Sequence, residues 1–438
     1  MKKLVITSAL SLVFMFASEQ PQSNSLSLGF NSALAADADK TQAKKKRRRT
    51  PAMGSRVYSQ LARAQELADA GDVPAGIEVL DQVKSKVSSL NSYERAMMYN
   101  FYGFIYYNAE RVPEAITAFE QVVEQSPIPE SLEQSTLFSL AQLAMANGRY
   151  DDTLKYLTRL DQVTEGPTPI KNLVLKAQAS YQNKDYQGAL TFISNAISES
   201  KAKQMVGEES WYVLQRAIYF ELQQPKQVTK VLETMVRLFS KAEYWVQLAG
   251  MYGELGEEAK QLAVMEAAYQ QGFVEKASDL RNLAQIYYFN GLPYKSAKVL
   301  DKGIKDKIVA ANPKNLKFLA QSWLGAKEYK QAITAYQELA KVSSDGDADQ
   351  QIAEIYLQQA KFNKVVAAAN QAVKKGKLTN PGNLYLALGM AHFNLESYDN
   401  ALTAFEQAKS HKSSKAMATT WLKFVAREQE KVKQLASN

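Results

Sequence analysis

The chain has 438 residues, a formal net charge of +8, no cysteine and only two histidines. The missing cysteines exclude disulfides, cysteine-ligated zinc, iron–sulfur clusters and thiol catalysis, and two histidines cannot build a multi-histidine metal site. Only 20 glycines and 12 prolines interrupt a chain rich in Ala, Leu, Gln, Glu and Lys, which favours helices over strands.

The first 35 residues are predicted to be an export signal. Lys2 and Lys3 precede an apolar run, Leu4–Ala17, that is shorter than the about 20 residues needed to span a membrane. The sequence Ala33-Leu34-Ala35 fits a small-residue cleavage site before Ala36. We therefore expect export and cleavage, with tethering to the inner membrane through an uncleaved signal as the alternative.

Residues 36–55 are predicted to form a basic, disordered linker. They are polar, lack an apolar period and end with Pro51 and Gly54. The linker contains six consecutive cations: Lys44, Lys45, Lys46, Arg47, Arg48 and Arg49. These cations either stay solvated and repel one another or contact a polyanion such as an anionic membrane surface.

From residue 56 to 412, one helical-hairpin pattern recurs about ten times. Each copy has a small residue in its first helix, where a second helix must approach closely, and large apolar residues beside it. We call this the small-residue position, and its members are Ala64, Gly103, Ala141, Ala177, Arg216, Ala249, Ala284, Ala320, Ala353 and Gly389. The fifth member, Arg216, is placed by spacing alone. The intervals run from 33 to 39 residues, which predicts an all-α solenoid of stacked hairpins.

Residues 413–438 are predicted to contain a C-terminal capping helix, Ala416–Ala436. Its apolar residues are expected to cover the last hairpin, because the end of a solenoid otherwise exposes its core. These residues are Met417, Trp421, Phe424, Val425 and Val432.

The repeated pattern resembles the tetratricopeptide repeat (TPR), with its W-x2-L-G-x2-Y and A-x3-F slots. The clearest copy is LYLALGMAHFNLESYDNALTAFEQA, Leu384–Ala408. The whole chain is also similar to periplasmic TPR proteins of TonB energy-transduction systems in gram-negative bacteria. The phrases that carry this likeness are SRVYSQLARAQELADAGDV, SLNSYERAMMYNFYGFIYY, YWVQLAGMYGELGEEAKQLAVMEAAYQQGF and the Leu384–Ala408 hairpin. The resemblance implies a right-handed α-solenoid in the periplasm that assists TonB-dependent uptake, such as iron–siderophore import, with parts of the TonB system as partners. An adaptor for envelope or polysaccharide assembly is the alternative.

The candidate partner-binding residues follow the small-residue position by one or four residues. In a TPR superhelix the first helices line the concave face, and these two positions are expected to point into it. The candidates are Gln65, Gln142, Gln178, Gln285 and Gln321, Tyr107, Tyr181 and Tyr288, and Met390 and Phe393. Glutamines offer donors and acceptors to the main chain of an extended peptide. The alternatives are a merely solvated helix face for the glutamines and interhelical packing for the aromatic residues.

The sequence offers no catalytic motif. His392 falls on a large packing position of its hairpin, and His411 lies in a polar stretch. The glycines of the run Gly250–Gly256 do not follow a predicted strand, so they do not indicate a nucleotide-binding loop. The carboxylates of Asp345–Asp349 are expected in a turn or helix cap. We therefore expect a non-enzymatic protein that needs no metal or cofactor and does not bind nucleic acid, with an oligomeric state that the sequence leaves open.

Overall fold

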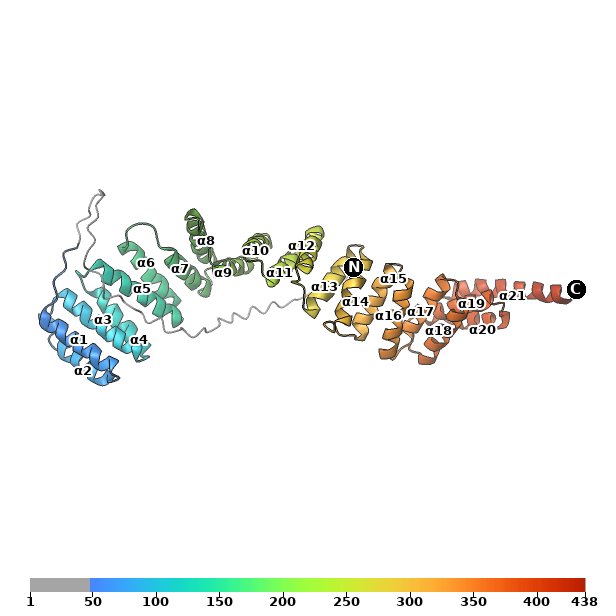
Figure 1. Ribbon diagram of the computed structural model, residues 1–438, viewed down its shortest axis with the longest axis horizontal. Coiled ribbons are helices and arrows are strands. Elements are labelled where there is room, and N and C mark those ends of the chain that lie inside the picture. Colours follow the sequence, from blue (N-terminus) through green and yellow to red (C-terminus); the bar gives the residue numbers. More distant parts are fainter. Residues whose placement is uncertain (1–47, 438) are drawn as a thin grey trace.

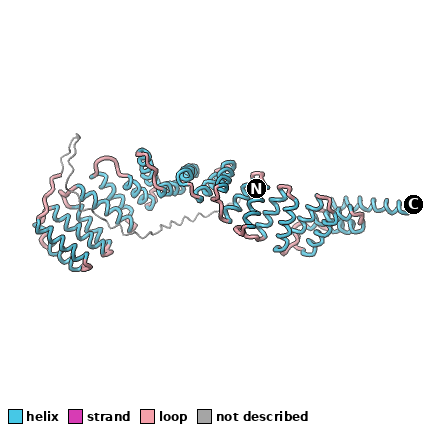
Figure 2. The backbone as a smooth tube through the Cα atoms, in the orientation of Figure 1, coloured by secondary structure: helices cyan, strands magenta, loops and turns pink. Residues whose placement is uncertain are grey.

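The computed structural model describes residues 48–437, which fold into α-helices joined by short turns, with one 3-10 helix, η1 (Val87–Ser89). Figure 2 shows no strand in this part of the chain. The predicted export signal and Lys44–Arg47 lie outside the described residues. No helix of residues 48–437 is long and apolar enough to cross a membrane.

The helices form ten antiparallel hairpins and one additional C-terminal helix. Helix bounds in chain order are α1 (Ser55–Asp69), α2 (Val73–Lys84), α3 (Ser92–Asn108), α4 (Val112–Glu124), α5 (Glu130–Ala146), α6 (Tyr150–Val163), α7 (Ile170–Gln182), α8 (Tyr186–Ala202), α9 (Glu209–Glu221), α10 (Pro225–Phe239), α11 (Ala242–Glu254), α12 (Glu258–Gln270), α13 (Ala277–Phe289), α14 (Pro293–Lys305), α15 (Pro313–Gly325), α16 (Tyr329–Val342), α17 (Asp347–Gln358), α18 (Phe362–Lys375), α19 (Pro381–Asn394), α20 (Tyr398–Lys409) and α21 (Lys415–Ser437). Each odd-numbered helix up to α19 packs against the next even-numbered one. Figure 1 shows the hairpins following one another along the long axis, so the predicted all-α solenoid of ten hairpins is confirmed.

Every hairpin turn uses the same backbone geometry. The small-residue position lies five residues before the last residue of each first helix. A residue with positive φ comes seven residues after the small-residue position. These turn residues are Gly71, Glu110, Gly148, Lys184, Gln223, Gly256, Gly291, Lys327, Ala360 and Glu396. Because Arg216 obeys both spacings, its predicted placement in the fifth hairpin is confirmed.

Close contact at the small-residue position holds the two helices of a hairpin together. A Cβ atom at Gly103 would lie 2.5 Å from Phe119 Cε1, and one at Gly389 would lie 2.6 Å from Phe405 Cε1. The alanines at the other positions, such as Ala64 and Ala141, are fully buried. Large rings therefore fill the space that small side chains leave open.

The last helix, α21, caps the solenoid with only part of its apolar set. Val425 is fully buried, and the Trp421 ring stacks on Phe405 with 5.3 Å between centroids. Met417 and Val432 are instead 54% and 46% exposed, so they do not cover the hairpin as expected. For Val432 the reason is visible in Figure 1, where the far end of α21 projects beyond α19 and α20, whereas Met417 is in the first turn of the helix.

The C-terminal end of the predicted linker, residues 48–54, contacts the solenoid. Residues 48–54 bind the second and third hairpins, since Gly54 N–H donates to Glu94 Oε1 of α3 at 2.9 Å and Asn91 Nδ2, just before α3, donates to the Ala52 carbonyl at 2.9 Å. Arg48 Nη1 donates to Glu133 Oε2 of α5 at 2.5 Å. Two buried carboxylates, Glu94 and Glu133, and the N-cap residue Asn91 thus hold this segment, although its composition predicts disorder.

Candidate functional site: the inner face of the solenoid

The first helices lie on the more closely packed side of the solenoid. Three pairs of neighbouring first helices contact each other: α1 with α3, α7 with α9, and α17 with α19. Consecutive second helices make no comparable contact in the described residues. Closer packing on one side of a stack of hairpins makes that side the inner, concave one. We call the surface formed by the first helices the inner face.

The five predicted glutamines occupy equivalent places on the inner face. Gln142, Gln285 and Gln321 are exposed, whereas Gln65 and Gln178 are half-buried. Gln65 Nε2 donates to Asp69 Oδ1 at 2.7 Å. Within residues 48–437, the side-chain amides of the other four form no hydrogen bond. Their donors and acceptors are therefore available to a partner.

The predicted aromatic residues divide into open and packed ones. Tyr107 is 38% exposed, which places its ring at the surface. Tyr288 meets the ring of Phe318 edge-on at 5.6 Å, and Tyr181 packs against Tyr186 at 5.6 Å. These contacts join neighbouring helices, so both rings contribute to packing as well as to the surface.

The last two candidates are covered on one side by the protein itself. Phe393 lies 5.8 Å from Trp421 and 5.3 Å from Phe424, both on α21. Met390 packs against the same cluster. Because α21 occupies this end of the inner face, the surface does not continue unobstructed past the tenth hairpin.

Arg216 places a charged side chain on the inner face, at the position where the other hairpins have alanine or glycine. Its Nη1 donates to Gln247 Oε1 of α11. Burial lowers the pKa of the Arg216 guanidinium, and no carboxylate within the described residues forms an ion pair with it. The sequence marked this position only as a departure from the repeat, and the structure makes it a link between the fifth and sixth hairpins.

Tyrosines hydrogen-bonded to carboxylates join successive hairpins beside the inner face, a feature that the sequence analysis missed. Tyr102 Oη donates to Asp81 Oδ1 at 2.5 Å, and Tyr252 Oη donates to Glu233 Oε1 at 2.6 Å. Each tyrosine is on a first helix, and its acceptor is on the second helix before it. A tyrosine following an acidic residue by 21 or 19 positions was the available sequence signal.

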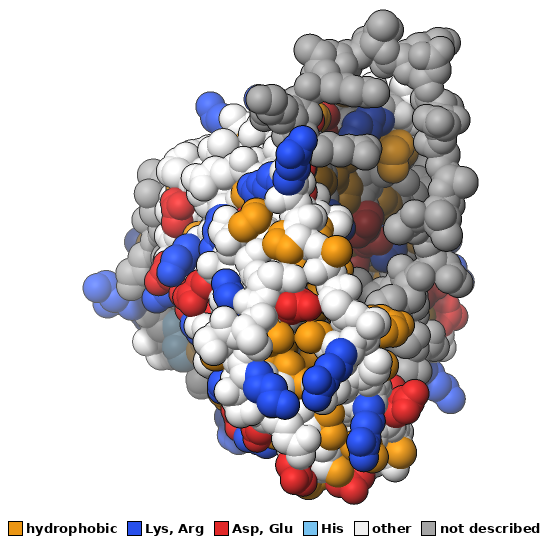
Figure 3. All heavy atoms as spheres, turned by 90° about the vertical axis from the view of Figure 1, so that its left-hand side faces the viewer, with side chains coloured by type: hydrophobic (Ala, Val, Ile, Leu, Met, Phe, Trp, Pro, Cys, Tyr) orange, Lys and Arg blue, Asp and Glu red, His pale blue; other side chains and the backbone are white. Residues whose placement is uncertain are grey.

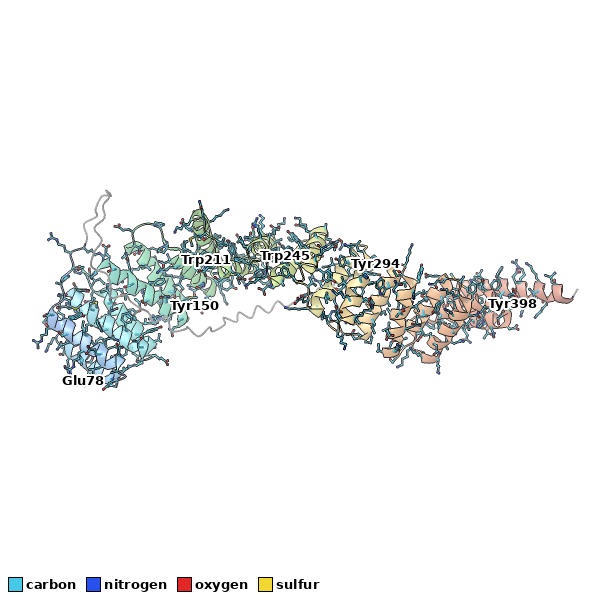
Figure 4. The ribbon with its side chains drawn as sticks, in the orientation of Figure 1. Glu78, Tyr150, Trp211, Trp245, Tyr294 and Tyr398 are labelled. Atoms are coloured by element: carbon cyan, nitrogen blue, oxygen red, sulfur yellow. The ribbon has the colours of Figure 1, made fainter. Side chains whose placement is uncertain are left out.

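Aromatic side chains from separate hairpins are spread along the whole solenoid rather than gathered into a single cleft. Figure 4 shows Trp211 and Trp245 in the middle hairpins, and Tyr150, Tyr294 and Tyr398 at the starts of second helices far apart. His392 is half-buried, and its burial lowers the pKa of the imidazole. No group of three or more metal-ligating side chains occurs in residues 48–437.

Of the six predicted N-terminal cations, Arg48 and Arg49 lie in the described residues. Arg48 binds Glu133, which also accepts from Arg159 Nη2 at 3.0 Å. Arg48 thus pairs with a carboxylate within the protein, and contact of the run with a polyanion stays a prediction. Arg49 is exposed. Figure 3 shows lysine and arginine side chains around exposed apolar atoms at this end of the molecule.

Two segments of the chain match tetratricopeptide repeat models, at residues 61–127 and 382–410. These two segments contain tetratricopeptide repeats, and the other hairpins share their turn geometry. A comparison with curated proteins found no match.

Several solved structures are similar to parts of this chain. A TPR-repeat protein from Cytophaga hutchinsonii, represented by its C-terminal part, is 14% identical, with 65% of this chain and 99% of that one covered and a TM-score of 0.34. A tetratricopeptide repeat protein from Parabacteroides merdae is 16% identical, with 59% and 98% covered and a TM-score of 0.30. YrrB, described as a TPR protein with an unusual peptide-binding site, is 13% identical, with 43% and 95% covered and a TM-score of 0.34. Since no score reaches 0.5, the repeat assignment depends on the sequence matches and the hairpin geometry.

Proposed function

We propose that this protein is a periplasmic scaffold that binds protein partners along its inner face and assists TonB-dependent transport across the outer membrane. The observation that carries partner binding is that four of the five inner-face glutamines have amides that are unpaired within the described residues. TPR proteins bind protein partners in general, and the unpaired amides suit the main chain of an extended segment. The periplasmic location and the TonB role are supported by the predicted export signal and by the resemblance described above.

The inner face would bind a partner through many weak contacts and would not catalyse a reaction. Gln142, Gln285 and Gln321 lie on three different hairpins, so a partner that reaches all three must run along the solenoid. Each contact between a neutral amide and a peptide group contributes only about 1 kcal/mol, and several must act together.

Cross-linking and capture from cell envelopes test partner binding directly. The triple variant Gln142→Ala, Gln285→Ala, Gln321→Ala should lose partner yield while keeping its thermal unfolding temperature. The matched control is Gln82→Ala, Gln187→Ala, Gln407→Ala, which removes three exposed glutamines from second helices. Equal yields from the two triple variants would contradict binding by the inner face.

The transport role has a separate test. Deleting the gene should slow growth on iron–siderophore as the sole iron source, and TonB-system proteins should be recovered in the capture experiment. Recovery of envelope-assembly or polysaccharide-assembly factors with unchanged growth would favour the alternative adaptor role. Unchanged growth without TonB components would remove the transport role and leave the scaffold.

A further inference from the structure

A pocket of about 400 Å³ opens between the eighth and ninth hairpins. Its walls come from α15, α16 and α17, the turn before α17 and the segment that precedes α19. Figure 1 places these elements next to one another in the C-terminal half of the solenoid. A volume of this size suits a small molecule rather than a folded partner.

One wall of the pocket carries two lysines without counterions. Lys314 and Lys317 are one turn apart on α15 and both line the pocket. Within residues 48–437, no carboxylate forms an ion pair with either ammonium group, although nearby lysines such as Lys305 and Lys341 are paired. An anionic group in the pocket would therefore find two available cations.

Another wall carries two carboxylates that lack a cation. Asp345 accepts from Ser343 Oγ at 2.7 Å, and Asp347 accepts from the Thr379 N–H at 2.8 Å and from its hydroxyl. These donors are neutral and hold the carboxylates in place without neutralising them. No ammonium or guanidinium in the described part of the chain pairs with either carboxylate, while Asp349 nearby is paired with Lys375 at 2.7 Å.

Two mostly buried side chains that line the pocket, Tyr336 and Gln350, have hydrogen-bonding capacity left over within the described residues. Tyr336 is 2% exposed, and its hydroxyl forms no hydrogen bond within the described residues. Gln350 is 4% exposed, and its Oε1 accepts no hydrogen bond although its Nε2 donates to Glu354 Oε1 at 2.9 Å. The Tyr336 hydroxyl can therefore donate to a ligand in the pocket without giving up a hydrogen bond within the described residues.

We propose that this pocket binds a small dipolar ligand that carries both a carboxylate and an ammonium group, of amino-acid or dipeptide size. The carboxylate binds Lys314 and Lys317, and the ammonium binds Asp345 and Asp347. One carboxylate can contact both lysines and one ammonium can contact both aspartates, so a ligand with both groups meets opposite charge on each wall, whereas a simple anion leaves the aspartates without a cation. The inner-face residue Gln321 also lines this pocket, but the proposed ligand is held by the lysines and aspartates and its binding does not depend on a protein partner.

Isothermal titration of the full chain with dipeptides tests the proposal. A panel of free Gly-Xaa dipeptides covering all side chains should include binders with a Kd of millimolar or tighter. The N-acetylated and C-amidated forms of each binder lack the ammonium and the carboxylate, respectively, and each should bind roughly tenfold more weakly or worse. If the acetylated form binds as tightly as the free dipeptide, the aspartates take no part and the dipolar assignment is wrong. If no dipeptide binds, the site assignment is wrong.

Substitutions in the pocket locate the binding. The double variant Lys314→Gln, Lys317→Gln should weaken binding roughly tenfold or more, and Tyr336→Phe should weaken it while keeping the ring in the core. The matched control is Lys327→Gln, Lys330→Gln, which removes two exposed lysines outside the pocket. Thermal unfolding in the absence of dipeptide establishes that each variant is folded. Equal weakening by the control pair would contradict this location.

Discussion

The phenol of Tyr252 on α11 donates a 2.6 Å hydrogen bond to Glu233 on α10, and this bond joins the fifth hairpin to the sixth. Burial of the phenol, together with this bond, raises the pKa of Tyr252 to about 12. The Lys260 ammonium lies 5.2 Å from the centroid of the same ring. One tyrosine therefore contacts an acid on the preceding hairpin and a cation on its own hairpin.

Replacing Tyr252 with phenylalanine should lower the free energy of unfolding by about 1 kcal/mol. The variant keeps the ring in the core and removes only the hydroxyl, and Glu233 is exposed enough for water to replace the lost donor. Urea unfolding measures the change. Tyr58→Phe is the control, because Tyr58 is 61% exposed. An equal loss in both variants would show that the hydrogen bond between the hairpins contributes nothing.

The free energy of unfolding should fall as the pH rises above 10, because three buried tyrosines must then ionise. The pKa of Tyr252, Tyr287 and Tyr336 is raised to about 12 in the folded state, above the ordinary value of 10.0. A raised pKa means that the folded state retains protons that the unfolded state has lost, so this contribution is complete below pH 10 and disappears as the pH rises toward 12. Phenolate absorbance and urea midpoints across that interval check this. A constant midpoint would contradict it.

The glycine at the small-residue position of the tenth hairpin should not tolerate a methyl group. A Cβ at Gly389 would lie 2.6 Å from Phe405, whose ring is fully buried and stacked on Trp421, so it has nowhere to move. Gly389→Ala should therefore cost about 1–3 kcal/mol.

Gly250→Ala provides the matched comparison for Gly389→Ala. Gly250 is also within a first helix, and a Cβ there meets no atom within 4 Å. This change should raise stability by about 0.5–1 kcal/mol through helix propensity. If both variants were stabilised, the predicted close contact between α19 and α20 would be wrong.

The turn residue of the ninth hairpin should be improved by glycine. Ala360 has a φ of 52°, a left-handed conformation that costs a residue with a Cβ roughly 1–2 kcal/mol. Ala360→Gly removes this cost but makes the unfolded chain more flexible, so we expect a net gain of about 0.5 kcal/mol. Ala367→Gly, in an exposed position inside α18, should lose about 1 kcal/mol. Hydrogen exchange in α17 and α18 reports both changes locally.

The repeat period predicted much of the fold because each hairpin depends on its own residues and its nearest neighbours. Small residues at one position, large residues beside them and a constant interval were sufficient to place all ten hairpins, including the fifth, where Arg216 replaces the small residue. The inner-face glutamines could be proposed by the same spacing. The packing of Phe393 and Met390 against α21 could not, because the direction in which a last helix leaves a hairpin is set by contacts and not by a period.

The sequence by itself determined the class of fold, the number of hairpins and the residues that first helices share, since these follow from local periodicity. Only the tertiary structure decided which groups meet across distant positions. It joined Arg48 to Glu133, placed Tyr252 on Glu233, and gathered Lys314, Lys317, Asp345 and Asp347 around one pocket. The physical reason is that such pairings depend on the offset and rotation between neighbouring hairpins. That geometry is set by the summed packing of many side chains, and no short sequence pattern encodes it.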